Sequence, residues 1–354
     1  MKEKRVRIEF IDSLKGFAIF LVVWGHCIQN LKKDINFFQN SVFEFIYSFH
    51  MPLFFMLSGF FFLSCLKLTL KDFICKKITQ LILPCLVWAI IYGLITLLGD
   101  VIKNQSIEYK LILSNIIDPL RWPFWFLREL FISFMLVFLF YKIFKKDWIV
   151  VFLSILFVLI LPFHNLYFQR YLLPMFLCGI LLGKYYCAIK KYSIQLVGIF
   201  FIIFLICLFF WKGEYTIYII GFPSLLSPEQ WRVMPASLFR FLIGISGSIF
   251  FFFLFEKIYI KNKIFSFLEI IGIKTLSIYI VQKLILETDF FNRLDFYFVN
   301  ETLFSCLIAP LMSILIIIIC LYIIKWIKKN KYVSFLLIGT QLPNSSKIKY
   351  NVNS

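Results

Sequence analysis

The stretch IDSLKGFAIFLVVWGH, residues 11–26, places a lysine and a histidine eleven positions apart in an apolar segment. At about 100° and about 1.5 Å per residue of an α-helix, Lys15 and His26 lie within about 20° of the same face and roughly 16 Å apart along the axis. Charged and titratable groups are costly inside a membrane and are usually retained there for function. The stretch therefore predicts a transmembrane helix with one face that handles an anionic group and moves a proton.

The composition extends this interpretation to the whole chain. Hydrophobic residues make up 61% of the 354 residues and aromatic residues 20%, and the mean hydropathy is +0.89, which excludes a water-soluble domain. A helix that crosses a bilayer needs about 20 mostly apolar residues. We predict an all-α integral membrane protein with about ten transmembrane helices, at residues 8–30, 44–66, 78–99, 124–141, 148–163, 171–187, 194–211, 235–256, 264–286 and 302–325.

The basic residues follow the topology of a membrane protein. The net charge of +18 would by itself also fit a nucleic-acid-binding protein. With a cytoplasmic N-terminus, however, the inner loops and tails carry 23 of the 37 Lys and Arg and the outer loops carry 9. This is the positive-inside bias. It predicts a multi-pass protein of the cell membrane, a bacterial inner or plasma membrane, with both termini cytoplasmic, membrane lipids as partners and no nucleic acid.

The cysteines and the chain ends add little chemistry. The nine cysteines are odd in number, lie mostly within predicted spans and include no C-x-x-C pair, so we expect neither a disulfide framework nor a metal site. We expect residues 1–330 to form a single transmembrane domain and residues 331–354 a cytoplasmic C-terminal tail.

The predicted orientation sorts the polar residues of the spans by depth. One group lies in the inner half of the membrane and the other in the outer half. The inner group is Asp12, Lys15 and Lys274, and the outer group is His26, His50, Arg128, Glu129, Arg240 and Gln282.

Several of these residues also have a structural interpretation. Lys15 and Lys283 could reach the headgroups with their long side chains. Arg128 and Glu129 could form an ion pair near the interface, and His50 could hydrogen-bond between helices without taking part in chemistry. His26 is the hardest of them to explain structurally, and its structural interpretation is a buried neutral histidine that hydrogen-bonds to a neighbour.

Four segments resemble the integral-membrane acyltransferase family 3. In that family a basic residue, ten intervening positions and a histidine form the opening signature, which residues 11–26 reproduce. The segments FHMPLFFMLSGF at 49–60, FWFLREL at 124–130 and IGIKTLSIYI at 271–280 are similar to later motifs of the family. The resemblance covers residues 7 to about 327.

The resemblance implies both a fold and an activity. Members of the family have ten helices and are commonly O-acetyltransferases, which move acetyl groups from cytoplasmic acetyl-CoA to hydroxyls of surface sugars. By this resemblance His26 takes part in acyl transfer and Lys15 assists the donor. One departure is Gln282, which stands where many members have a histidine. A glutamine can hydrogen-bond but cannot titrate.

We therefore predict a membrane O-acyltransferase, with residues 1–330 as its acyltransferase domain. It transfers an acyl group, expected to be acetyl, from acyl-CoA to a hydroxyl of a cell-surface glycan or its lipid-linked precursor, with no bound cofactor. His26 either deprotonates the acceptor or forms an acyl-imidazole relay, and both routes stay open. The predicted catalytic residues are His26, His50 and Glu129, and the predicted binding residues are Lys15, Asp12, Arg128, Arg240 and Gln282.

A transporter of a polysaccharide or of a small acid is the main alternative. Ten spans and a polar interior fit it equally well from composition alone. Against it, the sequence has no twofold internal repeat and no paired broken helices of the kind that transporters often contain.

Overall fold

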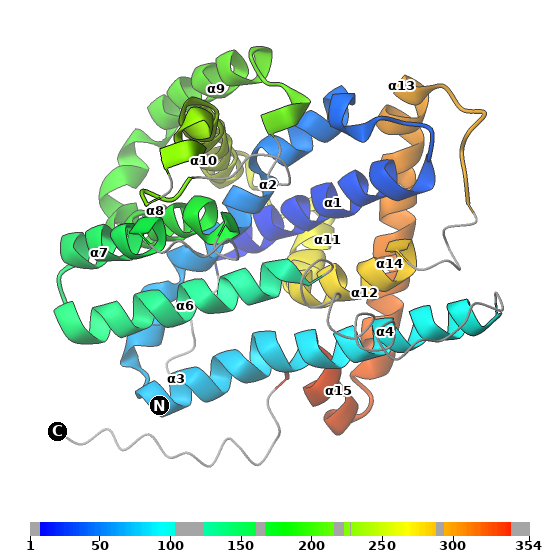
Figure 1. The fold of residues 1–354 in the computed structure, drawn as a ribbon, viewed down its shortest axis with the longest axis horizontal. Coiled ribbons are helices and arrows are strands. Elements are labelled where there is room, and N and C mark those ends of the chain that lie inside the picture. The colour runs from blue at the N-terminus through cyan, green and yellow to red at the C-terminus, as the bar shows by residue number, and fades with distance from the viewer. Residues whose placement is uncertain are drawn as a thin grey trace.

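A computed structural model describes residues 8–102, 124–160, 167–215, 223–226, 228–287 and 294–340, and within these ranges the chain forms helices and no strands (Figure 1). The α-helices are α1 Glu9–Leu31, α2 Ser41–Phe60, α3 Leu70–Lys77, α4 Leu83–Ile102, α6 Trp125–Phe144, α7 Asp147–Ile160, α8 Tyr167–Ile189, α9 Ser193–Phe209, α10 Met234–Ile258, α11 Lys263–Gly272, α12 Thr275–Glu287, α13 Glu301–Leu303, α14 Ala309–Ile327 and α15 Lys331–Ile338.

The helices agree with the predicted class of multi-pass membrane protein. A helix is present at each of the ten predicted positions. Among the described residues, six helical segments are long and apolar enough to cross a bilayer, or seven if the bent pair α11–α12 counts as one span. The predicted number of ten spans therefore stays a prediction.

One of the six segments contains two helices that run in opposite directions. It extends over 42 residues, from Phe168 to Phe209, or about 63 Å if straight, which is about twice the hydrocarbon thickness of a bilayer. Tyr186, late in α8, donates a hydrogen bond to Glu256, late in α10. Tyr215, just beyond α9, packs against Phe239, early in α10. The chain therefore turns back between α8 and α9, so that α9 returns along α10.

Helix α1 lies among several partners and crosses α11 closely. It packs against α2, α10, α11, α12 and α14. At the crossing, a Cβ on Gly16 would run into the carbonyl group of Leu268, and a Cβ on Gly272 would run into that of Asp12. Small residues are what allow two membrane helices to approach this closely. The signature segment of the chain is therefore also a packing surface.

The predicted single helix at 264–286 is broken. Helices α11 and α12 meet at an angle of 79° around Ile273 and Lys274, directly after the close contact at Gly272. The apolar pattern of this segment is continuous and so cannot reveal a bend. The break turns α12 so that it lies along α1, and it leaves the first N–H groups of α12 without partners inside the helix.

Asn40, the residue before the first turn of α2, hydrogen-bonds to residues 301–305, which come much later in the chain. The side chain of Asn40 caps α2 by accepting a hydrogen bond from the N–H of Phe43 at 3.0 Å. Its amide group donates to Glu301 and to Ser305, both at 2.9 Å. Farther along, Phe49 of α2 stacks on Phe251 of α10, with ring centroids 4.5 Å apart. These contacts hold α2, which carries His50, in place beside α1.

Candidate functional site

His26 lies beside a carboxylate that the sequence did not single out. The histidine is 5% exposed, and its Nδ1 is 3.9 Å from Oε1 of Glu287, the last residue of α12. Glu287 also forms an ion pair and a hydrogen bond with Lys283, one turn earlier in α12. Among the described residues, Nδ1 of His26 has no hydrogen-bond partner. A small movement of either side chain would bring this nitrogen within hydrogen-bonding distance of the carboxylate.

Lys283 lies inside the protein and is only 6% exposed. In the sequence it could be taken as a lysine that reaches the outer headgroups, whereas the structure pairs it with Glu287. The spacing of four residues between them is that of a helical ion pair, which is the one signal by which sequence reasoning could have found Glu287. Together with Lys283, the half-buried Glu287 carboxylate gives a group that is neutral when His26 is neutral and carries one positive charge when His26 is protonated.

His50 lies close to this group on α2. Its Nδ1 is 2.7 Å from the carbonyl oxygen of Ile46, and because a carbonyl only accepts, Nδ1 carries the proton and donates. The neutral ring therefore presents its Nε2 as an acceptor. The ring packs edge-on against Tyr47 at 4.7 Å. His26, His50 and Lys283 are near enough to interact electrostatically.

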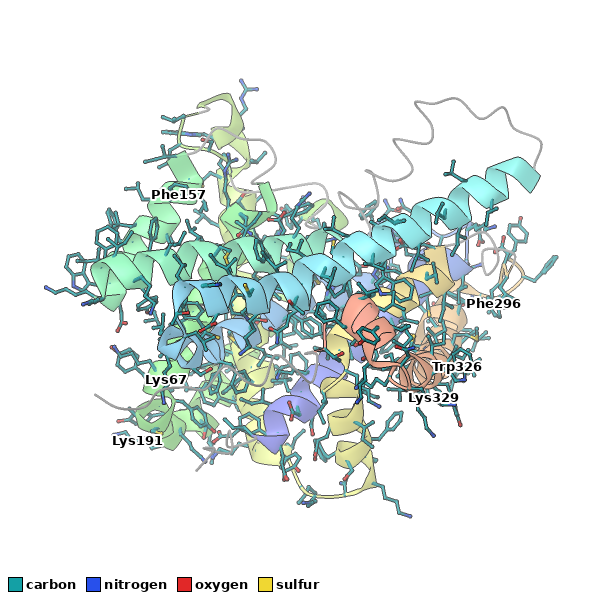
Figure 2. All side chains as sticks on the ribbon, turned by 90° about the horizontal axis from the view of Figure 1, so that it is seen from below. Lys67, Phe157, Lys191, Phe296, Trp326 and Lys329 are labelled. Atoms are coloured by element: carbon teal, nitrogen blue, oxygen red, sulfur yellow. The ribbon has the colours of Figure 1, made fainter. Side chains whose placement is uncertain are left out.

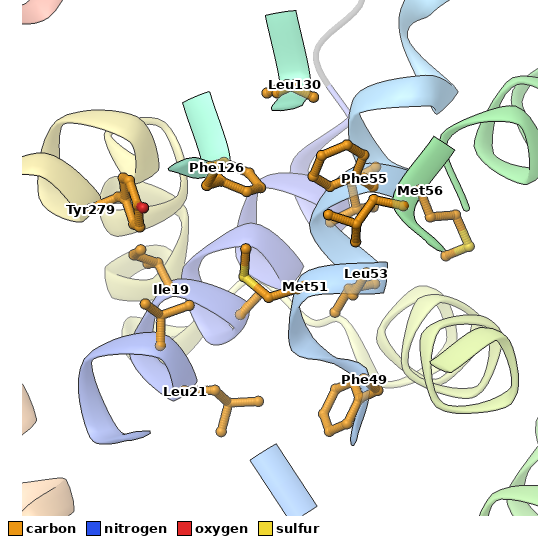
Figure 3. Packing of buried hydrophobic residues seen from close by; sticks show 14 of the residues in the cluster. Ile19, Leu21, Phe49, Met51, Leu53, Phe55, Met56, Phe126, Leu130 and Tyr279 are labelled. Carbon is orange, nitrogen blue, oxygen red and sulfur yellow. The ribbon is translucent and has the colours of Figure 1, made fainter. Parts of the chain in front are cut away.

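A cavity of about 390 Å³ lies next to the histidines, on the N-terminal side of His26 along α1. Its apolar walls include Ile19 of α1, Met51 of α2, Phe126 of α6 and Tyr279 of α12, which face one another in Figure 3. The rings of Phe126 and Tyr279 are 5.4 Å apart. Val22 also lines the cavity, one helical turn before His26, and Met51 follows His50 directly. The apolar end of the cavity therefore reaches to within about one turn of both histidines.

The opposite end of the cavity is basic. Four lysines line it, namely Lys15, Lys77, Lys274 and Lys328, together with the first residues of α12. Lys15 pairs with Asp12 at 3.4 Å and lies 4.6 Å from the centroid of Phe61. Lys77 is buried, with its ammonium 3.2 Å from the centroid of Phe134. The positive end of the α12 dipole adds to this charge, so the geometry suits an anion with a long apolar arm.

Arg128 and Glu129 form a separate group at the start of α6. The guanidinium of Arg128 donates two hydrogen bonds to Oε1 of Glu129, at 2.9 and 2.7 Å. Glu129 is fully buried, and its Oε2 has no hydrogen-bond partner among the described residues. Gln169 of α8 bonds the Glu129 carbonyl and accepts from Ser133. The predicted ion pair is therefore present, on the side of α6 that faces α8.

Arg240 and Gln282 occupy two further places. The guanidinium of Arg240 lies 3.7 Å from the ring centroid of Tyr171, whose hydroxyl donates to the Arg240 carbonyl at 3.3 Å. Gln282 is fully buried and donates to the carbonyl of Tyr279, and its Oε1 has no partner among the described residues. Gln282 directly precedes Lys283 in α12.

The sequence-predicted residues thus fall into four places in the fold. His26 and His50 come together, with Gln282 one position before Lys283 in α12, and Lys15 and Asp12 lie at the basic end of the cavity. Arg128 with Glu129, and Arg240 with Tyr171, form the other two. Sequence reasoning missed Glu287, Tyr279 and Lys328. Within the described residues, no cluster of His, Cys, Asp or Glu could hold a metal ion.

The site thus places a histidine beside a carboxylate in a bundle of apolar helices, next to a cavity that four lysines line. Residues 8–328 match the acyltransferase domain of acyltransferase family 3. The chain belongs to this family, and it is a multi-pass membrane protein.

Curated relatives support the assignment over parts of the chain. The nodulation protein NolL of Mesorhizobium japonicum is 32% identical over 134 residues, which cover 36% of this chain and 34% of the relative. The nodulation protein NolL of Sinorhizobium fredii is 28% identical over 185 residues, which cover 49% of this chain and 48% of the relative. The chain thus spans about a third to a half of the length of these relatives. No solved structure matches the chain.

Proposed function

We propose that this acyltransferase moves an acetyl group from cytoplasmic acetyl-CoA to a hydroxyl group of a cell-surface glycan or of its lipid-linked precursor. The observation that carries the proposal is the cavity, which has four lysines at one end and ends about one turn from His26 at the other. Acyl-CoA combines phosphates with a linear arm that ends in a thioester. The phosphates match the lysines, and the arm matches the apolar walls.

His26 then acts as the general base. A sugar hydroxyl has a pKa far above 7, so its attack on a thioester needs a base, and a neutral imidazole serves near neutral pH. The acceptor O–H gives its proton to His26 while its oxygen forms a bond to the thioester carbonyl carbon. The C–S bond breaks, and the thiolate of CoA takes the proton back from His26. No net proton is consumed, and the products are the ester and free CoA.

Glu287 acts on this step through His26. Its carboxylate lies 3.9 Å from Nδ1 of the imidazole. Once a small movement brings the two within hydrogen-bonding distance, Glu287 orients the ring and stabilises the imidazolium that forms during transfer. Lys283 holds the Glu287 carboxylate in place through their ion pair and hydrogen bond. Glu287 is therefore a positioning residue, whereas His26 contacts the reacting atoms.

A direct assay separates this proposal from a transporter. Purified protein in lipid vesicles should release free CoA from labelled acetyl-CoA in the presence of an acceptor, whereas a transporter should leave acetyl-CoA intact. The O-acetyl content of surface glycans, measured by mass spectrometry with and without the gene, then identifies the acceptor. Vesicles that bind acetyl-CoA but never release CoA would contradict the proposal.

Because acetyl-CoA is cytoplasmic, the proposal requires the basic end of the cavity to face the cytoplasm. We expect ten spans with both termini in the cytoplasm. The predicted inner loops and tails contain 23 Lys and Arg residues, and the predicted outer loops contain 9. Single cysteines at Asp295 and at Gln105, which lies outside the described residues, should react with an impermeant reagent added from outside. A cysteine in the loop at 67–77 should not react. The reverse pattern would place the basic cavity on the wrong side for acetyl-CoA.

A change at Lys15 tests the donor end. Replacing Lys15 with alanine removes a charge that interacts with phosphate, so KM for acetyl-CoA should rise about tenfold. Lys15→Arg should retain most of the affinity, because it keeps the positive charge. Steady-state kinetics with varied acetyl-CoA measure both. Small and equal effects of the two substitutions would instead indicate a lysine that only reaches the headgroups.

A further inference from the structure

The cavity has a wall that lies beyond the family match. That match ends at residue 328, whereas α15 follows it as a well-capped helix. The side chain of Asn330 accepts hydrogen bonds from the N–H groups of Tyr332 and Val333 at its start. The indole N–H of Trp88 in α4 donates to the carbonyl of Leu337 at 2.8 Å near its end. Helix α15 therefore lies against α4, as Figure 1 shows.

The end of α15 packs against the π-helical segment Ile78–Ile82, which follows Lys77. Gly339 has φ of 70°, in the left-handed region, and closes α15 with a hydrogen bond to Phe335. A Cβ at Gly339 would also collide with the backbone of Thr79 and Gln80. Only glycine meets both demands without strain. As a result, Ile338, Gly339 and Thr340 form part of the cavity lining.

This wall adjoins the basic end of the cavity. Lys77, Lys274 and Lys328 line the cavity together with residues 338–340, and no Asp or Glu is among its described lining residues. Lys274 and Lys328 are close enough to repel each other. An anion bound near them would relieve that repulsion. The hydroxyl of Thr340, bonded to Ser334 at 2.9 Å, adds a polar group to the same wall.

We propose that the segment 331–340, together with Lys328, forms the site for the phosphate-bearing end of the acyl donor. The inference rests on the proposed use of acyl-CoA. In this arrangement the nucleotide phosphates stay at the basic end, and the thioester reaches the apolar end near His26. The segment thus selects nucleotide-bearing thioesters over short ones, although it lies outside the part of the chain that defines the family.

Two donors test the proposal on the full-length protein in vesicles. Acetyl-CoA and S-acetylpantetheine share the thioester and the arm, but only acetyl-CoA carries the phosphorylated nucleotide. Lys328→Gln should raise KM for acetyl-CoA about tenfold and leave turnover of S-acetylpantetheine unchanged. Lys329→Gln is the matched control, because Lys329 points outward beside Trp326, 5.7 Å from its ring, and does not line the cavity (Figure 2).

Truncation tests the segment itself. A chain that ends after Thr340 should behave as the wild type, whereas a chain that ends after Asn330 should lose the preference for acetyl-CoA. Because the shorter chain also uncovers Trp88, its amount in the membrane is measured alongside. Lys328→Gln leaves α15 in place, so it tests the site even if the shorter chain fails to fold.

The possible outcomes are distinct. Equal effects of Lys328→Gln on both donors, or no effect on either, would overturn the assignment of the phosphate site while leaving the acyltransferase activity established. A wild-type protein that uses neither donor would instead overturn the proposed donor class. That result is read from the wild type alone, before any variant is compared.

Discussion

Replacing His26 with glutamine should lower the rate of acetyl transfer by about a hundredfold to ten-thousandfold, the usual cost of removing a general base. Glutamine can fill much of the space and hydrogen-bond to Glu287, but it cannot accept a proton. The variant should therefore reach the membrane at a near-normal level and still leave the glycan unacetylated. Transfer from labelled acetyl-CoA and an immunoblot of membranes measure the two quantities separately.

The chain provides its own control for this experiment. His164 is the third histidine and has no assigned role, and it lies outside the described residues. His164→Gln should transfer acetyl groups at the wild-type rate. Full activity of a well-expressed His26→Gln protein would remove His26 from the mechanism.

His50 and the relay route can be examined with the same assay. His50→Gln should be equally or less impaired, since Nδ1 of His50 is already engaged by the Ile46 carbonyl. If His26 itself carries the acyl group, withholding the acceptor should trap a labile acetyl group on the wild-type protein. If His26 acts only as a base, no label should remain on the protein once acetyl-CoA is removed.

Replacing Glu287 with glutamine should reduce kcat by about tenfold to a hundredfold, the range expected when one charged interaction with the reacting base is lost. KM for acetyl-CoA should stay near its wild-type value, because Glu287 lies away from the basic end of the cavity. A fall in kcat without a rise in KM identifies an effect on the chemical step. A merely structural role would reduce the amount of protein and leave kcat per molecule intact.

Lys283 offers a second check on the same prediction. In Glu287→Gln the charge of Lys283 remains buried near His26 without its partner, which opposes the formation of an imidazolium. The double variant Lys283→Met, Glu287→Gln removes this charge and should be more active than Glu287→Gln alone. A double variant that is as impaired as the sum of the two single changes would show that the three groups do not act together.

The features that the sequence predicted are those that depend on local spacing along the chain. Lys15 and His26 share α1, and the helices lie where long apolar segments predicted them. Arg128 and Glu129, which are adjacent in the chain, form the expected ion pair. Each of these features follows from helical periodicity or adjacency, which a single sequence records directly.

The features that sequence reasoning missed depend on which helices pack against each other in the fold. The break at Ile273 and Lys274 is set by the packing of Gly272 on α1, and an apolar pattern does not encode it. Glu287 was hidden because it lies just past the predicted span at 264–286, and only the path of α12 along α1 brings it to His26. Thr340 lies in the segment predicted as a tail, and it lines the cavity because α15 packs on α4 and Gly339 packs on Thr79 and Gln80.

The cavity draws its walls from both ends of the described chain, and this imposes an order on biosynthesis. Lys15 leaves the ribosome early, whereas residues 338–340 emerge only after α14. Until then the growing chain holds His26 and a partly formed cavity, but lacks the wall beside Lys328. On the proposed function, a nascent chain in the translocon would be unable to retain the donor, and activity would arise as a late step of assembly.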